Sequence, residues 1–289
     1  MLGWVTTLIQ RAAASQKRIN EFLQLKSDIT SSNPSQPTIT GSISFKNVSF
    51  TYPDTGIEAL KNINFDIEKG QLIAIIGRTG SGKSTLANLI MRMYDADAGQ
   101  ILIDGEELRT VNLSNYRNQI GFVPQEVFLF SDTIKNNIAF GLAEVSDEQV
   151  EQAAKNAAVY ANIIDFEKKF ETMLGERGIT LSGGQKQRVS IARALIKEPT
   201  LLIFDDCLSA IDTKTEEEIL GNLGKVMAGK TSIIIAHRIS TIKNADKIIV
   251  LDDGVIIEQG THQTLLNLGG VYAEMYANQL LEEETTPMS

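Results

Sequence analysis

The sequence is poor in cysteine, in long apolar runs and in positive charge, and each shortage argues against a class of protein. Cys207 is the one cysteine among 289 residues, so an internal disulfide is excluded and a reducing compartment is expected. No apolar run reaches the ~18 residues that a membrane-spanning helix needs. The net charge of −9 disfavours a nucleic-acid partner, because a phosphate backbone requires a basic face. We therefore expect a soluble, cytosolic chain.

The N-terminal segment, residues 1–27, has the pattern of an amphipathic helix. Its apolar residues recur at helical spacing, beginning with Leu2, Val5, Leu8 and Ile9. The basic residues follow this apolar stretch instead of preceding it, so no secretory signal is expected. Trp4 and these basic residues suit a membrane interface, but an ordinary amphipathic helix explains them equally well. Residues 28–41, which contain two prolines and several serines and threonines, are typical of a linker.

Strand patterns predominate from residue 42, except in a helical region at about 126–197. The alternation in residues 43–52 changes phase at Lys46-Asn47, which predicts a β-bulge. Residues 201–204 and 232–235 are continuous apolar runs, as buried parallel strands are. Further along, the pattern predicts a hairpin around Asp252-Asp253-Gly254, a last helix opening at Thr261, and a disordered acidic tail over residues 281–289. The sequence thus predicts an α/β fold.

The central motif is a glycine-rich loop with the pattern G-x-x-x-x-G-K-S. An apolar strand over residues 72–76 leads into it, and a helical pattern starting at Thr85 follows. Glycines let the backbone wrap closely around phosphates, and the helix N-terminus adds partial positive charge. Lys83 is expected to neutralise the β- and γ-phosphates, and the Ser84 hydroxyl to bind Mg²⁺. The expected nucleotide contacts are Gly77, Arg78, Thr79, Gly80, Ser81, Gly82, Lys83, Ser84 and Thr85.

Two acids directly follow the apolar run at 201–204. Parallel strands deliver ligand groups at their C-terminal ends, so Asp205 is expected to hold Mg²⁺ through water. Asp206 follows directly and is expected to polarise an attacking water. Four apolar residues lead straight into this pair, which disfavours an ordinary surface turn.

A set of motifs resembles those of the ABC-type ATPases. Leu181-Ser182-Gly183-Gly184-Gln185 matches the family's signature, and Gln125, Ser209–Asp212 and His237 match its Q-loop, D-loop and switch histidine. The resemblance covers about residues 42–280. It implies a RecA-like, P-loop NTPase core with a mainly parallel sheet, an antiparallel β subdomain and an α-helical signature subdomain.

The resemblance also implies roles for single residues. Tyr52 is expected to stack on adenine, although packing within a strand would also explain it. Gln125 would join Ser84 and Asp205 at the metal, and His237 would contact the γ-phosphate. The catalytic residues would be Asp206, His237, Gln125 and Lys83. His262 lacks this context and is expected to be structural.

In the family, two domains pair head to tail around shared ATP. The second anion site would come from Ser182, Gly183, Gly184 and Gln185 of the opposite domain, which faces the phosphate loop across the nucleotide. Metal-assisted hydrolysis of ATP is the implied reaction. The implied partners are a second ABC ATPase domain and an ABC transmembrane domain, and the implied cofactors are ATP and Mg²⁺.

Asp206 is a departure from the family, which usually has Glu after the metal-binding Asp. An Asp at this position resembles one chain of heterodimeric exporters, whose own site hydrolyses ATP slowly. The rival interpretation is a homodimer in which Asp206 suffices.

Two further features resemble the exporter branch. Gly175-Glu176-Arg177-Gly178 resembles the loop that contacts the opposite membrane domain, and residues 1–27 resemble the cytosolic end of the last membrane helix. We therefore expect an ATPase domain of a longer polypeptide, working at the cytoplasmic face of the inner membrane. The alternatives are a soluble ABC ATPase acting on nucleic acid or the ribosome, which would carry a coiled-coil insertion or tandem domains, and a non-catalytic subunit that only holds ATP.

Overall fold

The computed structural model describes residues 2–25, 27, 29–31, 33–175, 178, 181–208 and 213–285. The chain divides into two compact units, residues 1–30 and residues 31–289. The first unit contains helix α1 (Leu2–Leu23), and the residues described along it are exposed. None of the helices in the described ranges combines the length and the apolar character needed to cross a bilayer.

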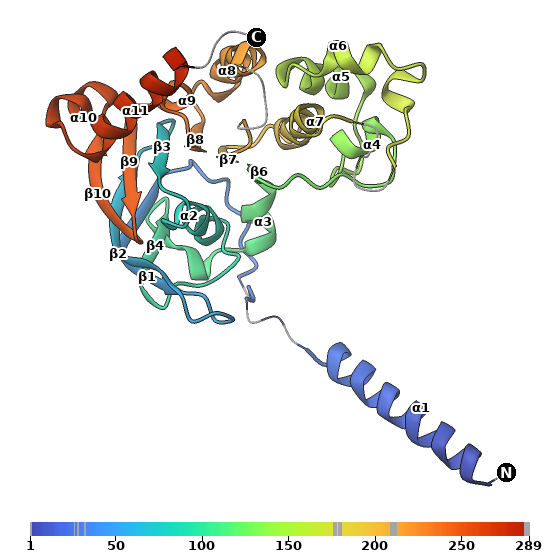
Figure 1. The fold of residues 1–289 in the computed structure, drawn as a ribbon. Coiled ribbons are helices and arrows are strands. Elements are labelled where there is room, and N and C mark those ends of the chain that lie inside the picture. The colour runs from blue at the N-terminus through green and yellow to red at the C-terminus, as the bar shows by residue number, and fades with distance from the viewer. Residues whose placement is uncertain are drawn as a thin grey trace. The chain divides into compact units, whose positions relative to one another are not determined.

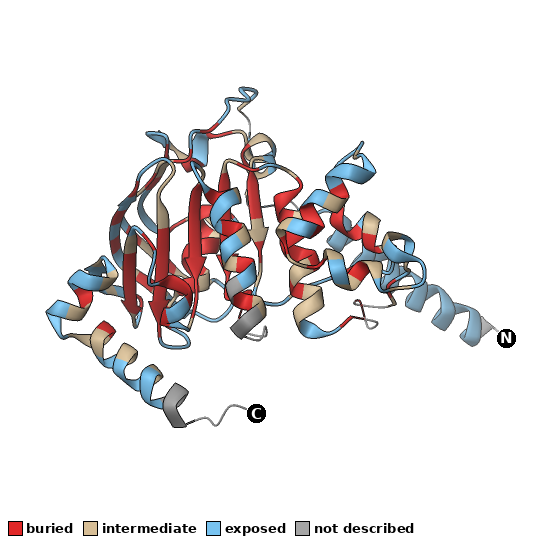
Figure 2. Ribbon diagram, turned by 90° about the horizontal axis from the view of Figure 1, so that it is seen from above, coloured by how far each residue is buried: buried red, intermediate tan, exposed pale blue. Residues whose placement is uncertain are grey.

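The second unit is built on a six-stranded sheet. Its strand order is β10-β9-β3-β8-β7-β6, and all neighbouring pairs are parallel except the β9–β10 hairpin. The central strands are buried along their length because helices and the second sheet cover both faces, as the red arrows of Figure 2 show. The strands are β3 (Leu72–Gly77), β6 (Ile120–Val123), β7 (Leu201–Asp205), β8 (Thr231–Ile235), β9 (Lys247–Asp252) and β10 (Val255–Gly260).

A second, antiparallel sheet has the strand order β2-β1-β4-β5. Helix α2 (Lys83–Ile90) lies between the two sheets, and its Leu86 and Leu89 share a core with Phe45 and Ile75 (Figure 1). The β-bulge is confirmed: the register shifts between Phe45 and Val48. The strands are β1 (Ile43–Thr51), β2 (Glu58–Ile67), β4 (Ala98–Ile103) and β5 (Glu106–Glu107).

A helical region follows β6, as the pattern over 126–197 predicted. Helix α7 packs against α4, α5 and β6, and it carries the signature at its N-terminus. Helix α5 begins with a capping box in which Ser146 and Gln149 bond each other's backbone N–H groups. The helices between β5 and β7 are η1 (Leu108–Thr110), α3 (Leu113–Asn118), α4 (Ile134–Ile138), α5 (Asp147–Asn156), α6 (Tyr160–Ile164), η2 (Lys169–Glu171) and α7 (Gly183–Leu195). Together these elements confirm the predicted α/β fold with its antiparallel and helical subdomains.

The C-terminal region corrects two expectations. Thr261 opens α10 (His262–Leu268), but this helix is not the last, because Gly269 ends it in a left-handed conformation with φ 66°. Helix α11 (Val271–Thr285) then begins, and the carboxylate of Glu258 accepts its first N–H groups. Residues 281–285 are therefore helical instead of disordered, since leucine and glutamate favour helix; residues 286–289 lie outside the described ranges. Between β7 and β9 lie α8 (Thr213–Met227) and α9 (Ile239–Ile242).

Candidate functional site

The parallel strands β3, β6, β7 and β8 end at one edge of the sheet, where a cleft of about 390 Å³ opens. Ligands of open α/β sheets bind at this edge, because successive strands deliver their following loops to the same place. Predicted site residues from five segments of the sequence line the cleft: Tyr52, Thr79, Gly80, Gly82, Lys83, Ser84, Thr85, Gln125, Asp205, Asp206 and His237.

The phosphate loop connects β3 to α2, as its pattern predicted. Gly80 and Gly82 have φ values of 82° and 100°, which side chains with a Cβ rarely adopt. A Cβ on Gly82 would also lie 2.5 Å from the carbonyl oxygen of Ala59. Glycine is thus required at position 82 by the backbone conformation and by the available space.

Lys83 is the first residue of α2, and its side chain is nearly buried. Its Nζ donates hydrogen bonds to the carbonyl oxygens of Gly77 at 3.0 Å and Arg78 at 2.9 Å. Burial lowers the pKa of Lys83, and the nearby Asp206 and Asp205 oppose this effect. An ammonium has three donors, so this arrangement leaves one for an anion in the cleft. The cleft therefore suits a phosphate.

Ser84 and Asp205 meet across the cleft, since the Ser84 hydroxyl donates to Asp205 Oδ1 at 3.0 Å. Burial raises the pKa of Asp205, with a smaller effect of Asp206 in the same direction, while Ser84, Lys83 and His237 oppose it. A hydroxyl, a carboxylate and the nearby amide of Gln125 form an all-oxygen donor set, which fits Mg²⁺. The described residues contain no cluster of three or more His, Cys, Asp or Glu side chains that could hold a metal by themselves. A magnesium ion here would depend on phosphate oxygens for its other ligands.

Asp206 lies between the loops that follow β6 and β8. Gln125 Nε2 donates to Asp206 Oδ2 at 3.1 Å, and His237 Nε2 lies 3.8 Å from the same oxygen. The backbone of Asp206 is left-handed, with φ 45°, and its N–H donates to the Ile235 carbonyl. Asp206, Gln125 and His237 are the residues other than Lys83 that were predicted to be catalytic. Their side chains therefore lie next to one another.

Tyr52 stands at the rim of the cleft. Its hydroxyl is 3.0 Å from Thr85 Oγ1, and its ring makes edge contacts with Phe50 and Tyr94. Tyr52 therefore packs against other aromatic rings, as the structural explanation of this residue required. The same ring also lines the cleft, so stacking on adenine stays a prediction.

The signature residues are not among those that line the cleft. Ser182 caps α7: its hydroxyl accepts from the Gln185 N–H, and the Gln185 side chain accepts from the Ser182 N–H. A Cβ on Gly183 would meet nothing within 4 Å, so this helix terminus is open. Gly184 follows in the first turn of α7, and its carbonyl accepts from Arg188. The structure does not bring the two predicted anion sites of one chain together.

Some expectations fall on residues that the structure leaves undescribed. Glu176 and Arg177 of the proposed contact loop, and Ser209–Asp212 of the proposed D-loop, lie outside the described ranges. Of the three remaining predicted phosphate-loop contacts, Gly77 ends β3, Ser81 is buried within the loop, and Arg78 is exposed and offers its carbonyl to Lys83.

Two residues outside the site are explained by their surroundings. His262 Nδ1 lies 2.7 Å from the Tyr272 hydroxyl, and the ring contacts Tyr272 and Tyr276 between α10 and α11. Cys207 is buried, and burial raises the pKa of its thiol.

Sequence reasoning missed the contribution of the start of β2 and of one distant turn. Ile57, Glu58 and Ala59, together with the β9–β10 turn at Asp253-Gly254, also line the cleft. Gly254 N–H donates to the Ser81 carbonyl, so this turn supports the phosphate loop from a distant part of the chain. The hairpin pattern revealed the turn, but no sequence signal indicated its contact.

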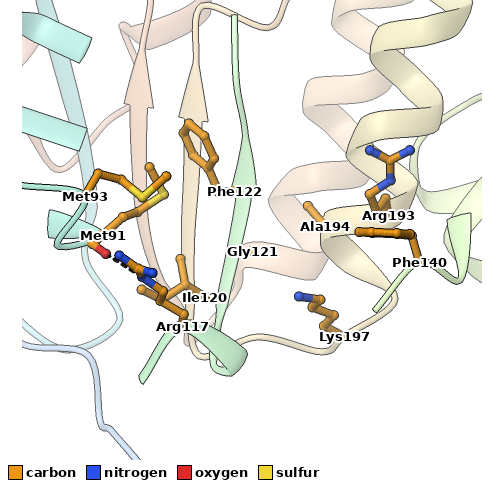
Figure 3. A pocket seen from close by; sticks show the side chains of 10 residues that line it. All are labelled: Met91, Met93, Arg117, Ile120, Gly121, Phe122, Phe140, Arg193, Ala194 and Lys197. Atoms are coloured by element: carbon orange, nitrogen blue, oxygen red, sulfur yellow. Dashed lines mark hydrogen bonds between the residues drawn. The ribbon is translucent and has the colours of Figure 1, made fainter. Parts of the chain in front are cut away.

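A second cavity, of about 240 Å³, lies between β6 and α7 (Figure 3). Its lining is apolar and basic: Met91, Met93, Arg117, Ile120, Gly121, Phe122, Phe140, Arg193, Ala194 and Lys197. Arg117 is already engaged, since its guanidinium donates to the Met91 and Arg92 carbonyls. This cavity has no carboxylate and no hydroxyl for a metal, so the cleft at the strand ends is the candidate site.

Known proteins agree with this assignment. A profile of the ABC transporter family matches residues 60–209, just over half of the chain. The ATP-dependent lipid A-core flippase of Pseudomonas fluorescens (strain Pf0-1) is 46% identical over 277 residues, which cover 96% of this chain and 46% of the flippase. The flippase of the same name from Escherichia coli (strain K12) is 48% identical over 241 residues, covering 83% of this chain and 41% of the flippase.

Among solved structures, a bacterial Atm1-family ABC exporter with ATP bound has a TM-score of 0.89 and 41% sequence identity. The match covers 97% of this chain and 50% of the exporter chain. The chain thus spans about half the length of its relatives. Because the family profile matches more than half of its length, this chain belongs to the ABC transporter family and is an ATP-binding domain of the exporter type.

Proposed function

We propose that this domain binds MgATP in the cleft at the strand ends and hydrolyses it to drive export through a membrane domain of the same polypeptide. The observation that carries this proposal is the buried Lys83, which has a donor to spare beside the Ser84–Asp205 contact. Lys83 would hold the phosphates, and Ser84, Asp205 and Gln125 would hold Mg²⁺, which neutralises phosphate charge during the reaction. The backbone around Gly77–Thr85 would supply N–H donors, and Tyr52 would contact the base.

In this proposal Asp206 orients the attacking water. Gln125 and His237 both lie near Oδ2 of its carboxylate and would orient it, and a carboxylate held in this way can accept a proton from an attacking water. His237 would stabilise the γ-phosphate as charge develops.

A second domain would complete each site. Ser182, Gly183, Gly184 and Gln185 lie away from the cleft of their own chain but present an open helix N-terminus, which favours an anion. The expected arrangement is a head-to-tail dimer with ATP at the interface. Because Asp206 replaces the family's usual Glu, we propose that the partner is an unlike chain and that this chain's own site is the slower one.

The proposed location is supported by the relatives, which are named as flippases and an exporter and are about twice as long. The domain would work at the cytoplasmic face of the inner membrane, with α1 continuing the last membrane helix. The loop at residues 175–178 would contact the opposite membrane domain.

The experiment compares Lys83→Ala with the exposed-turn variant Lys69→Ala. Loss of a charge-assisted contact should weaken MgATP binding about 10- to 100-fold in the first variant only. The ATPase rate of the wild-type chain, assayed together with its unlike partner chain, should rise more than linearly with the concentration of the two chains. Equal binding by both variants, or a rate strictly proportional to concentration, would refute the proposal.

A further inference from the structure

The main chain around His237 is held by a side chain from the C-terminal helix. Gln279, on α11, donates from Nε2 to the His237 carbonyl at 2.6 Å and accepts from the Ile239 N–H through Oε1 at 2.8 Å. One amide thus binds the backbone on both sides of Arg238. Nothing in the sequence motifs points to position 279.

A neutral amide is the side-chain group suited to this double contact, since it offers a donor and an acceptor on one planar group. Ile239 begins helix α9, and the N-cap residue Arg238 makes no capping bond with its own side chain. The first N–H groups of a helix lack partners within it, so Gln279 acts as a cap supplied from another helix. Helix α11 is itself anchored, because Tyr272 is fully buried and Met275 and Tyr276 pack against the core.

A buried carboxylate holds the same segment from helix α8. Glu216 accepts from Arg238 Nη1 at 2.8 Å and from the Thr241 hydroxyl. A cavity of about 160 Å³, lined in part by Asp206, Glu216 and His237, lies against the segment. The chain from His237 to Thr241 is therefore not held by close packing on the side of this cavity. Its position depends on the polar contacts of Glu216 and Gln279.

We propose that Gln279 is a positioning residue of the ATP site, which fixes the backbone from which the His237 side chain reaches the γ-phosphate. The inference rests on the proposed function of His237. Gln279 itself does not line the cleft, so it should leave nucleotide binding intact and affect only the catalytic step. A displacement of about 1 Å at a catalytic group can lower the rate by roughly 10²-fold.

The test uses the full chain with Gln279→Leu, which removes both contacts at similar size, and Gln279→Glu, which keeps the acceptor but loses the donor. Gln263→Leu is the matched control, because Gln263 lies exposed on α10 and bonds only Asn267 among the described residues. Three quantities are measured: the dissociation constant of fluorescent MgATP, the single-turnover hydrolysis rate, and hydrogen exchange of the peptide covering residues 236–242.

Gln279→Leu should hydrolyse ATP about 10- to 100-fold more slowly, with unchanged MgATP affinity and faster exchange over 236–242. Gln279→Glu should fall between it and wild type, and Gln263→Leu should match wild type. Wild-type hydrolysis and exchange in Gln279→Leu would overturn the inference, as would parallel losses of hydrolysis and MgATP affinity. A wild-type chain that neither binds nor hydrolyses MgATP would instead overturn the proposed function.

Discussion

Gln125 Nε2 and Asp206 Oδ2 lie 3.1 Å apart, so the carboxylate proposed to orient water is bonded to the loop that leads from β6 into the helical region. The same oxygen is 3.8 Å from His237 Nε2. Movement of the helical region relative to the sheet would be transmitted through Gln125 to this carboxylate. The contact also shows that the shorter Asp side chain reaches Gln125 from its left-handed backbone.

Replacing Asp206 by Glu tests the slow-site hypothesis. We expect ATP turnover at this site to rise roughly 10- to 100-fold in the assembled dimer, because the longer side chain brings the carboxylate to the position usual in the family. The left-handed backbone at φ 45° should make the same variant less stable by about 1 kcal/mol. ATPase assays and denaturant unfolding measure the two effects, with Asp66→Glu on the exposed edge of β2 as the control. An unchanged or lower ATPase rate would leave the homodimer, with Asp206 sufficient, as the better interpretation.

Asp205→Asn should change the stability of the fold and the magnesium-dependent binding of ATP in opposite directions. Burial raises the pKa of Asp205 above its ordinary value of 3.8, so the folded chain binds this proton more tightly than the unfolded chain does. Stability is therefore lost as pH rises from 3.8 through the raised pKa, and the neutral amide should avoid that loss. We expect Asp205→Asn to raise the free energy of unfolding at pH 7, and the difference to disappear at low pH.

The same variant should weaken magnesium-dependent ATP binding about 10- to 100-fold, as expected for a residue that holds the metal through water. Thermal unfolding from pH 3 to pH 8 and ATP titrations with and without Mg²⁺ provide the measurements. A less stable Asp205→Asn variant at pH 7 would show that the attraction of Lys83 and the Ser84 bond outweigh the cost of burial.

Gly183→Asp tests the contribution of the signature to a second chain. The position is open within this chain, and a carboxylate in the first turn of α7 favours the helix, so the monomer should remain folded. Facing a triphosphate, the added charge should raise the dissociation constant of the ATP-dependent dimer at least about tenfold. Sedimentation with a slowly hydrolysed ATP analogue measures this constant. Gly221→Asp, an equal change of charge on the exposed part of α8, should dimerise like wild type, and equal dimerisation by both variants would contradict the head-to-tail arrangement.

The sequence by itself determined the elements and most of the candidate site. The phosphate loop, the buried strands and the acids at 205–206 are encoded locally, because glycine conformation, apolar runs and strand-to-loop order need only neighbouring residues. Their convergence could also be inferred, since parallel strands end at a common edge. Local pattern failed at the C-terminus, where Gly269 and the distant Glu258 divide one expected helix into two.

Tertiary structure alone decided which distant groups support that site. Gly254 contacts the Ser81 carbonyl, and Gln279 contacts the chain beside His237, across separations that no sequence period records. Such contacts involve one hydrogen-bonding group each, and their partners are set by how the sheet, α8 and α11 pack. The reactive residues of the cleft therefore lie in contiguous sequence motifs, whereas their positions relative to one another depend on the folded chain as a whole.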